Sequence, residues 1–220
     1  MKWSAIRVTV LAIGLGFALI ASARVPALAS SPGLLEFAAV TGGPSQAVLA
    51  AAQAAYQHAL DLGVVVKPRL LTVIDYSRPS TEPRLWVLDL VSHAIIQREL
   101  VAHGKGSGEN VATSFSNDEG SHKSSLGLFL TDAAYVGQNG YSLRLRGLDP
   151  GVNDRAYARD IVIHGAEYVS EAVAHTLGRI GRSWGCPAVR PAVARTLIDE
   201  IKGGTVLFAY GAASPRQQSR

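Results

Sequence analysis

The spacing of hydrophobic and polar residues changes after residue 63, from a helical pattern to a strand pattern. Residues 44–62 are rich in alanine, with Ser45 as a cap near the start and Gly63 just after the end, and therefore predict a helix. From residue 70 onward, short runs rich in β-branched and aromatic residues predict strands. These runs cover 70–77, 84–90, 94–104, 126–131, 141–148, 159–165 and 205–210.

The connecting segments carry turn and helix signals. Residues 91–93 are short enough for a hairpin loop, 148–151 read "LDPG" and predict a turn, and 153–159 predict a short capped helix. A further helix begins at Pro191, places its apolar residues on one side, and stops at the glycine pair 203–204. The pattern predicts a mainly β, mostly antiparallel domain with a few helices, of the α+β class.

The N-terminus has the features of a secretory signal. Lys2 and Arg7 precede an uncharged apolar run of sixteen residues, 8–23, and Ala27-Leu28-Ala29 matches a signal peptidase site. An uncleaved anchor is the alternative, but the run is shorter than the roughly 18 to 20 residues that span a bilayer. We expect cleavage after Ala29, with Ala23 as a second possible site, and a mature protein in the periplasm or cell envelope, free of the membrane.

Removal of the signal changes the charge balance. Three of the 21 basic residues and none of the 17 acidic residues lie within 1–29, so 18 basic residues face 17 acidic ones in the remainder. This near-neutral balance gives no support for nucleic-acid binding. We expect an N-terminal segment over 30–69 that contains the helix, one domain over 70–210 and a flexible tail over 211–220, because no repeat or linker divides the chain.

The chain contains a single cysteine, Cys186, between Gly185 and Pro187. In an oxidising compartment a lone thiol makes no intramolecular disulfide, and the flanking residues indicate a turn rather than a core element. Cys186 is therefore a candidate nucleophile, with a buried inert thiol as the alternative. A catalytic thiol near its ordinary pKa needs a base or a positive environment to form the thiolate.

Six histidines compete for the role of base. His164 ends the apolar run 161–163 and precedes Gly165, so a rigid strand would aim its imidazole. His103 also ends a predicted strand and is the main rival, whereas His175 lies where no strand holds it. The others have the character of surface or helix residues: His58, His93 and His122. No pair of histidines has zinc-like spacing and no CxxC is present, which disfavours a metal site or thiol redox exchange, and no cofactor is expected.

Two segments, "IVIHGAEYVS" and "GRSWGCPAV", resemble the His-Gly and Ser-His-Gly-Cys elements of the L,D-transpeptidases, which cross-link the bacterial cell wall. The likeness is to the murein L,D-transpeptidase catalytic domain branch, in which tryptophan replaces the second histidine. It extends in the right order over most of residues 56–210. It implies a mixed-sheet or β-sandwich catalytic domain of the YkuD-like type.

The resemblance also implies roles for individual residues. Cys186 would be the nucleophile, His164 the general base, and the Gly165 carbonyl the group that fixes the imidazole tautomer. The backbone N–H groups of Trp184, Gly185 and Cys186 would form an oxyanion hole, a role that fits the tight turn Gly185 permits. The implied substrate-binding residues are Arg182, Ser183, Ser125, Gly127, Phe129 and Tyr168.

Two positions depart from the family pattern. Trp184 stands where the family usually has histidine, and Ala188 stands where a basic or amide residue commonly follows the cysteine. Another cation would then have to bind the substrate carboxylate, with Arg182 and Arg190 as candidates and ordinary surface charge as their alternative role.

The implied function is an exported cysteine L,D-transpeptidase acting on peptidoglycan stem peptides. A thioester would form at Cys186 as the terminal D-alanine leaves, and an amine or water would resolve it. The alternatives with the same residues are an L,D-carboxypeptidase and an enzyme that attaches or releases a wall-bound lipoprotein. A non-catalytic wall-binding module is the alternative of another class.

Overall fold

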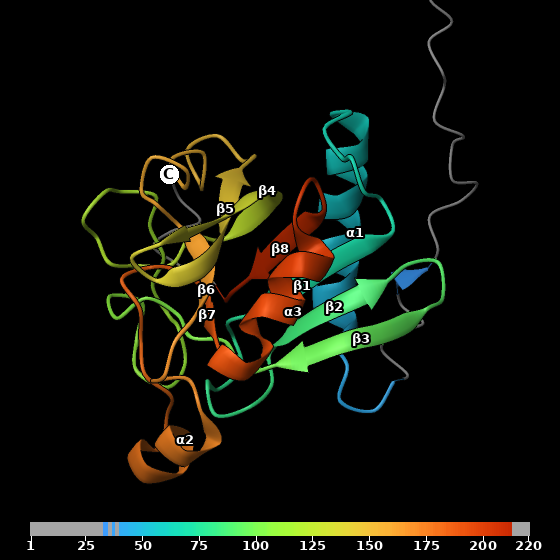
Figure 1. Cartoon of the computed structure of the whole chain (residues 1–220). Coiled ribbons are helices and arrows are strands. Elements are labelled where there is room, and N and C mark those ends of the chain that lie inside the picture. The colour runs from blue at the N-terminus through green and yellow to red at the C-terminus, as the bar shows by residue number, and fades with distance from the viewer. Residues whose placement is uncertain (1–32, 35–36, 38–39, 213–220) are drawn as a thin grey trace, which may run out of the picture. The chain divides into compact units, whose positions relative to one another are not determined.

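The computed structural model describes residues 33–34, 37 and 40–212. The predicted signal 1–29 and most of the predicted tail lie outside these residues. The described part contains three helices and one sheet of eight strands (Figure 1). The elements are α1 (Gln46–Asp61), β1 (Leu70–Asp75), β2 (Leu85–Asp89), β3 (Ala94–Glu99), β4 (Gly127–Gly137), β5 (Gly140–Gly147), β6 (Val162–Gly165), α2 (Glu171–Leu177), β7 (Ala188–Val189), α3 (Pro191–Ile201) and β8 (Val206–Tyr210).

The sheet is mixed, with strand order β3-β2-β1-β8-β4-β5-β6-β7. The pairs β1–β8 and β6–β7 are parallel and the other neighbours are antiparallel. This confirms the predicted mainly β fold with a few helices. None of the described helices has the length and apolar character needed to cross a membrane.

Both long helices form where their end signals predicted them. The Ser45 hydroxyl accepts the Val48 N–H at the start of α1, and Gly63, just after its end, has a φ of +67°. Such a left-handed residue ends a helix at no steric cost when it is glycine. Pro191 opens α3, whose apolar side is buried and contains Ala194, Leu197, Ile198 and Ile201.

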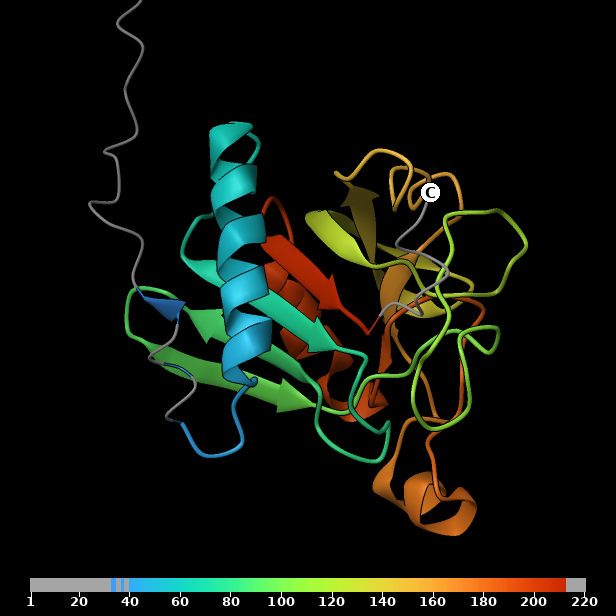
Figure 2. The ribbon, with the colours of Figure 1, turned by 180° about the vertical axis from the view of Figure 1, so that it is seen from behind.

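The central strands are buried on both faces because the two helices cover opposite sides of them (Figures 1 and 2). Alternate residues of β1 face different hydrophobic clusters. Val73 packs in the cluster that contains Val48 and Leu49 of α1, called the α1 cluster below. Ile74 packs in the cluster that contains Leu197 and Ile198 of α3, called the α3 cluster. The same alternation separates Val206 from Leu207 in β8. Because both faces are covered, these strands read as nearly continuous apolar runs.

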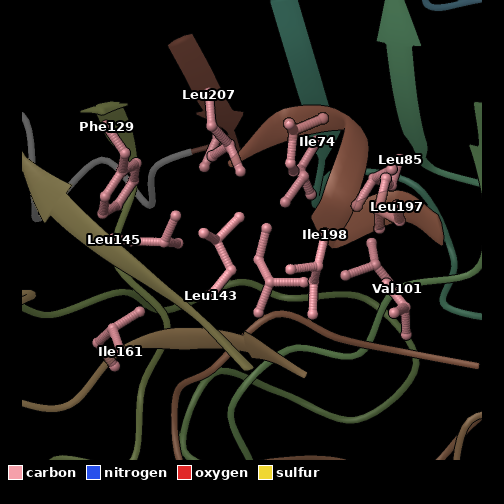
Figure 3. Packing of buried hydrophobic residues seen from close by; sticks show 14 of the residues in the cluster. Ile74, Leu85, Val101, Phe129, Leu143, Leu145, Ile161, Leu197, Ile198 and Leu207 are labelled. Atoms are coloured by element: carbon pink, nitrogen blue, oxygen red, sulfur yellow. The ribbon is translucent and has the colours of Figure 1, made fainter. Parts of the chain in front are cut away.

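The α3 cluster also receives side chains from β5, β6 and the segments beside them. Figure 3 shows Leu143, Leu145 and Ile161 converging with Leu197 and Ile198 on one packed core. Since α3 anchors β6 from this core, the strand that carries His164 has a fixed position in the domain.

The segment 153–159 does not form the short helix that the sequence predicted; it is a series of turns. The Asn153 side chain is fully buried. Its amide donates to the carbonyls of Leu126 and Leu128, both at 2.9 Å, and its oxygen accepts the Asp149 N–H. The predicted cap residue therefore ties this loop to the start of β4.

The other differences between the predicted and observed elements lie mainly where side chains are exposed, because exposure weakens the hydrophobic pattern. β4 continues beyond residue 131 to Gly137, with a register shift between Thr131 and Ala134, and its end is largely exposed. β6 begins at Val162 rather than at 159, because Asp160 has a positive φ of 53°. The sequence pattern did not predict α2, which has no buried residue, or the two-residue strand β7.

Candidate active site

The parallel pairing of β6 with β7 brings the cysteine turn to the histidine strand. In its register His164 faces Ala188 and Gly165 faces Val189, so Cys186 lies two residues before the partner of His164. The half-buried Cys186 side chain packs against the α3 cluster. Its Sγ lies 3.5 Å from the carbonyl oxygen of Asp160, just before β6. Segments distant in sequence thus meet at one end of the β6–β7 pair.

His164 is held by its own strand and has a defined tautomer. Its side chain is buried, with 6% of the residue exposed, and Nδ1 lies 2.9 Å from the Gly165 carbonyl oxygen. Since a carbonyl only accepts, Nδ1 carries the hydrogen and Nε2 keeps its lone pair. A Cβ at Gly165 would lie 3.0 Å from Ala194 Cβ, so glycine allows α3 to pack closely behind this position. His164 can therefore act as a base through Nε2.

Burial favours the uncharged forms of both groups. It lowers the pKa of His164, with the hydrogen bond to Gly165 acting in the opposite direction. It raises the pKa of the Cys186 thiol above its ordinary value near 9, while the Val162 N–H and the Arg159 charge oppose this effect. The resting pair is therefore a neutral thiol and a neutral imidazole near pH 7. A thiolate in this site would require transfer of the thiol proton to a base.

The turn before Cys186 is fixed by hydrogen bonds from both sides. Gly185 has a φ of +129°, and a Cβ there would lie 2.9 Å from the Lys123 carbonyl oxygen. The Ser183 hydroxyl accepts the Gly185 N–H at 3.0 Å and donates to the Cys186 carbonyl at 2.6 Å. The Ser124 hydroxyl donates to the Gly185 carbonyl at 3.1 Å. Only glycine fits this tight, left-handed position.

These bonds distinguish the three amides proposed for the oxyanion hole. The Gly185 N–H is engaged by Ser183, so an oxyanion would have to compete with that hydroxyl. Within the described part of the chain, the N–H groups of Trp184 and Cys186 have no backbone or side-chain oxygen as acceptor. These two N–H groups therefore have no oxygen acceptor in that part of the chain to give up before they could donate to an oxyanion.

Trp184 is exposed at the mouth of the site. The residue is 71% exposed, and its ring stacks on His122 with centroids 5.1 Å apart. The Lys105 ammonium lies 5.2 Å from the same ring. A pocket of about 220 Å³ adjoins it, lined by Glu119, Gly120, His122, Ala158, Arg159, Asp160 and Trp184.

In the main rival base, His103, both ring nitrogens already have hydrogen-bond partners. It is fully buried, its Nδ1 lies 2.7 Å from Arg84 Nη2, and its Nε2 lies 3.3 Å from the Gly108 carbonyl oxygen. Because Arg84 can only donate, Nδ1 is the acceptor and Nε2 carries the hydrogen. Burial and the Arg84 charge lower the pKa of His103 to about 4. No lone pair remains on this ring to take a proton from the thiol.

The remaining histidines lie elsewhere. His175 is on the exposed helix α2, and His58 is in the last turn of α1. His93 occupies the β2–β3 turn with a φ of 55° and stacks on Phe37. His122 is the only one of these four that contacts the cysteine turn, through its stacking on Trp184.

The predicted substrate-binding residues have different surroundings. Ser125 is buried, and its hydroxyl donates to the Ser116 carbonyl at 2.9 Å. Phe129 is buried in the α3 cluster, and Gly127 begins β4 with a φ of +95°. Tyr168 packs against Gly181, and burial followed by the Cys186 charge raises its pKa to about 12. Tyr168 is thus close enough to Cys186 for the charge of a thiolate to affect its hydroxyl.

Both arginines proposed to bind a carboxylate already have carboxylate partners. Arg182 Nη1 lies 2.6 Å from Glu109 and 2.8 Å from the Gly108 carbonyl oxygen. Arg190 contacts both oxygens of the buried Glu99, at 2.8 and 2.9 Å. Two-point pairing of this kind fixes a guanidinium and satisfies its charge. Neither arginine is a free cation.

Arg159 is the cation that sequence reasoning overlooked. Its guanidinium lies against the cysteine turn, since a Cβ built on Gly185 would be 3.5 Å from Arg159 Nη2. It ends the predicted helix 153–159 and begins the predicted strand 159–165 but belongs to no motif, so only its position just before the histidine strand could have marked it.

No group of three or more metal-binding side chains occurs among the residues the structure describes. The site therefore consists of a thiol, a neutral imidazole and backbone amides, with an arginine and a tryptophan at its mouth. This combination suits acyl transfer through a covalent cysteine intermediate.

Comparison with known protein families identifies the family of the chain. A family model described as the L,D-transpeptidase catalytic domain matches residues 42–210. No curated protein matches the chain.

Three solved structures illustrate how distant the similar folds are. An L,D-transpeptidase from Xylanimonas cellulosilytica is 17% identical, with 70% of this chain and 68% of that chain covered and a TM-score of 0.38. One from Mycobacterium smegmatis is 14% identical, with 64% and 58% covered and a TM-score of 0.37. The cell shape determining protein Pgp2 from Campylobacter jejuni is 10% identical, with 66% and 48% covered and a TM-score of 0.43.

The aligned part of the chain thus spans 58% of the length of the M. smegmatis enzyme. The family match itself extends from just before α1 to the end of β8 and includes both the histidine strand and the cysteine turn. The chain belongs to the L,D-transpeptidase catalytic domain family.

Proposed function

We propose that this protein is an exported cysteine L,D-transpeptidase that cross-links peptidoglycan stem peptides. One observation carries the proposal: the β6–β7 register places the Cys186 turn beside His164, whose Nδ1 is committed to the Gly165 carbonyl. Nε2 keeps its lone pair, and we propose it as the base that takes the proton of Cys186, the single thiol of the chain. Family membership supports peptidoglycan as the substrate, and we propose the stem tetrapeptide as the donor.

The acylation step follows from this arrangement. His164 Nε2 takes the thiol proton, and Cys186 Sγ bonds to the carbonyl carbon of the third residue of the donor stem. The oxygen that becomes negative is stabilised by the N–H groups of Trp184 and Cys186. As the peptide C–N bond breaks, the imidazolium gives its proton to the leaving nitrogen. D-alanine departs and a thioester remains on Cys186.

Deacylation repeats the same exchange with an acceptor. The side-chain amine of a second stem attacks the thioester carbonyl, His164 takes a proton from that amine, and the C–S bond breaks. The proton then returns to the sulfur. For transfer to win over hydrolysis, the site must hold the amine close, because proximity supplies effective molarities of roughly 10⁵ M or more against water at about 55 M.

The test is the product distribution from a disaccharide-tetrapeptide incubated with the secreted form of the protein. Mass spectrometry should detect dimers joined between two third-position residues, with one D-alanine released per bond. Tripeptide without dimer at high substrate concentration would reject cross-linking and favour an L,D-carboxypeptidase. Absence of D-alanine release, with the peptide still bound, would favour a wall-binding module. Release that requires added wall lipoprotein would favour the lipoprotein-attaching enzyme.

Export is part of the same proposal and has its own test. Its support is the charged start, the apolar run 8–23 and the small-residue site at 27–29. Expression in a bacterial host should place the protein in the periplasmic fraction, and N-terminal sequencing should begin at Ser30. A protein that stays in the membrane fraction with Met1 intact would contradict cleavage.

A further inference from the structure

Arg159, at the mouth of the site, differs from Arg182 and Arg190 in having no acidic partner within 4.0 Å in the part of the chain that the structure describes. Among the described residues, Arg159 makes no ion pair within 4.0 Å, whereas Arg182 and Arg190 both do. Its acceptors are neutral: the carbonyls of Ser116 and Lys123 and two serine hydroxyls, at 2.6 to 3.3 Å. The carboxylate that acts most strongly on Arg159 is the exposed Asp118, which forms no ion pair with it within 4.0 Å, so Arg159 brings to the cysteine turn a positive charge that no acid of the described chain contacts.

These four bonds also fix the guanidinium in place. They use both Nη1 and Nη2, and leave Nε–H without an acceptor in the described part of the chain. A cation that is already immobilised loses little side-chain entropy when a ligand binds. Partial burial weakens the screening of its charge by solvent.

The pocket beside Arg159 shares two lining residues with the surroundings of Cys186. Its lining contains Asp160, whose carbonyl contacts Cys186 Sγ, and Trp184, two residues before the cysteine. Two carboxylates also lie on this lining, but both residues are exposed: the Asp160 side chain is 80% exposed and 3.4 Å from Arg144, and Glu119 is exposed as well. Exposed charges are strongly screened, so the charge of the half-buried Arg159 is the less screened one in this lining.

A donor tetrapeptide has a matching negative group. Its free carboxylate belongs to the residue whose amide bond is cleaved, only one residue beyond the carbonyl that Cys186 attacks. An anion bound beside Gly185 would thus lie next to the reacting carbonyl. The position after the cysteine where the family commonly has a basic or amide residue is here the buried Ala188, which cannot bind it.

We infer that Arg159 binds the terminal carboxylate of the donor stem peptide in the pocket beside Trp184 and makes the enzyme specific for peptides that end in a free D-residue. This inference rests on the proposed function. Binding of the carboxylate next to the scissile bond positions the carbonyl over Cys186 and excludes donors extended or blocked at that end.

The experiment compares two synthetic donors, a tetrapeptide with a free C-terminal carboxylate and the same peptide as its C-terminal amide. Wild-type protein should release D-alanine from the acid with a kcat/KM about 10- to 100-fold higher than it releases D-alaninamide from the amide, as expected for a charge-assisted contact. Arg159→Gln should abolish this preference, so that the rate with the acid falls about 10- to 100-fold more than the rate with the amide; any effect of the lost charge on the Cys186 thiol acts on both donors equally. Arg159→Lys should restore part of the preference.

The amide donor serves as an internal control for folding and thiol reactivity. Arg155→Gln is the matched variant, because this exposed arginine lies four residues earlier and does not line the pocket. It should behave as wild type with both donors. Equal loss of both rates in Arg159→Gln would overturn the inference, because it would mean that Arg159 supports the turn or the thiolate instead. Absence of any acid preference in the wild type would also overturn it.

A binding measurement separates this inference from the proposed function. Cys186→Ala should bind the acid more tightly than the amide in calorimetry, and the preference should vanish in Cys186→Ala/Arg159→Gln. If wild type cleaves neither donor but this pattern of binding holds, the transpeptidase proposal fails and the carboxylate site stands. If wild type cleaves both donors equally and binding shows no preference, the carboxylate site fails and the proposed function stands.

Discussion

Ser124→Ala should affect both stability and acylation because one hydroxyl joins two backbone segments at the active site. The Ser124 side chain is buried, accepts the Gly104 N–H at 3.0 Å and donates to the Gly185 carbonyl at 3.1 Å. Removal of the oxygen leaves a buried N–H and a carbonyl without this partner. The peptide group between Gly185 and Cys186, whose carbonyl accepted this hydrogen bond, is then held less firmly.

The expected cost follows from these two bonds. A buried donor left unsatisfied costs about 1–3 kcal/mol and a lost ordinary hydrogen bond about 1 kcal/mol, so unfolding should become easier by roughly 2–4 kcal/mol. For a domain of this size, each kcal/mol corresponds to about 2–4 °C in Tm, giving a decrease of roughly 4–16 °C. Loosening the turn should also reduce the acylation rate by about 10- to 100-fold, since small misplacements at a reacting centre are costly.

The assay combines urea unfolding followed by far-UV circular dichroism with acylation of Cys186 followed by intact mass. Ser80→Ala is the matched control. Ser80 is equally buried, its hydroxyl accepts the Ile180 N–H at 3.2 Å and donates to Asn110 at 3.0 Å, and it has no contact with the cysteine turn. It should lose a similar amount of stability and keep its acylation rate.

Two results would refute this reasoning. If Ser124→Ala is destabilised as much as Ser80→Ala but acylates at the wild-type rate, the Ser124 bond does not position the turn. If Ser124→Ala loses no stability, the two buried hydrogen bonds do not contribute the roughly 2–4 kcal/mol to the free energy of unfolding that is expected from them.

Three further predictions concern the catalytic groups. Cys186→Ala should keep the fold and lose all covalent modification by a tetrapeptide donor or a carbapenem; an adduct on the variant would exclude Cys186 as the nucleophile. His164→Ala should slow acylation by about 10²- to 10⁴-fold. His103→Ala should lower Tm because buried Arg84 loses an acceptor, and His175→Ala should change neither the acylation rate nor Tm. A larger loss of acylation rate in His175→Ala than in His164→Ala would identify a different base. The acylation rate should rise with pH through the His164 pKa, with a midpoint below 6.5, because burial lowers this pKa and only the neutral imidazole accepts the proton; a rise that instead follows thiol ionisation into the alkaline range would contradict general-base catalysis.

The sequence alone determined the elements that depend on local signals. The Ser45 cap, the glycine after α1 and Pro191 at the start of α3 act within a few residues of themselves, so their effects can be read without the fold. The strands at the centre of the sheet were equally clear, because burial on both faces makes them continuously apolar. The lone Cys186 and the strand-end His164 were candidates for the same reason: each stands out from its immediate neighbours.

Tertiary structure decided everything that depends on a partner distant in sequence. Asn153 carries a helix-cap signal, yet its amide bonds to the carbonyls that flank β4 formed a loop instead. His103 and His164 were both strand-end histidines, and only the contact with buried Arg84 removed one of them as a base.

The charges at the site show the same division. Whether an arginine is a free cation depends on which carboxylate the fold brings to it, and this is why Arg182 and Arg190 are paired while Arg159 is not. The register of β6 with β7 is likewise a long-range property, because a two-residue strand has too few residues to show a period. Sequence marked the thiol and the imidazole as candidate groups, and the parallel pairing of β6 with β7 brought the segments that carry them side by side.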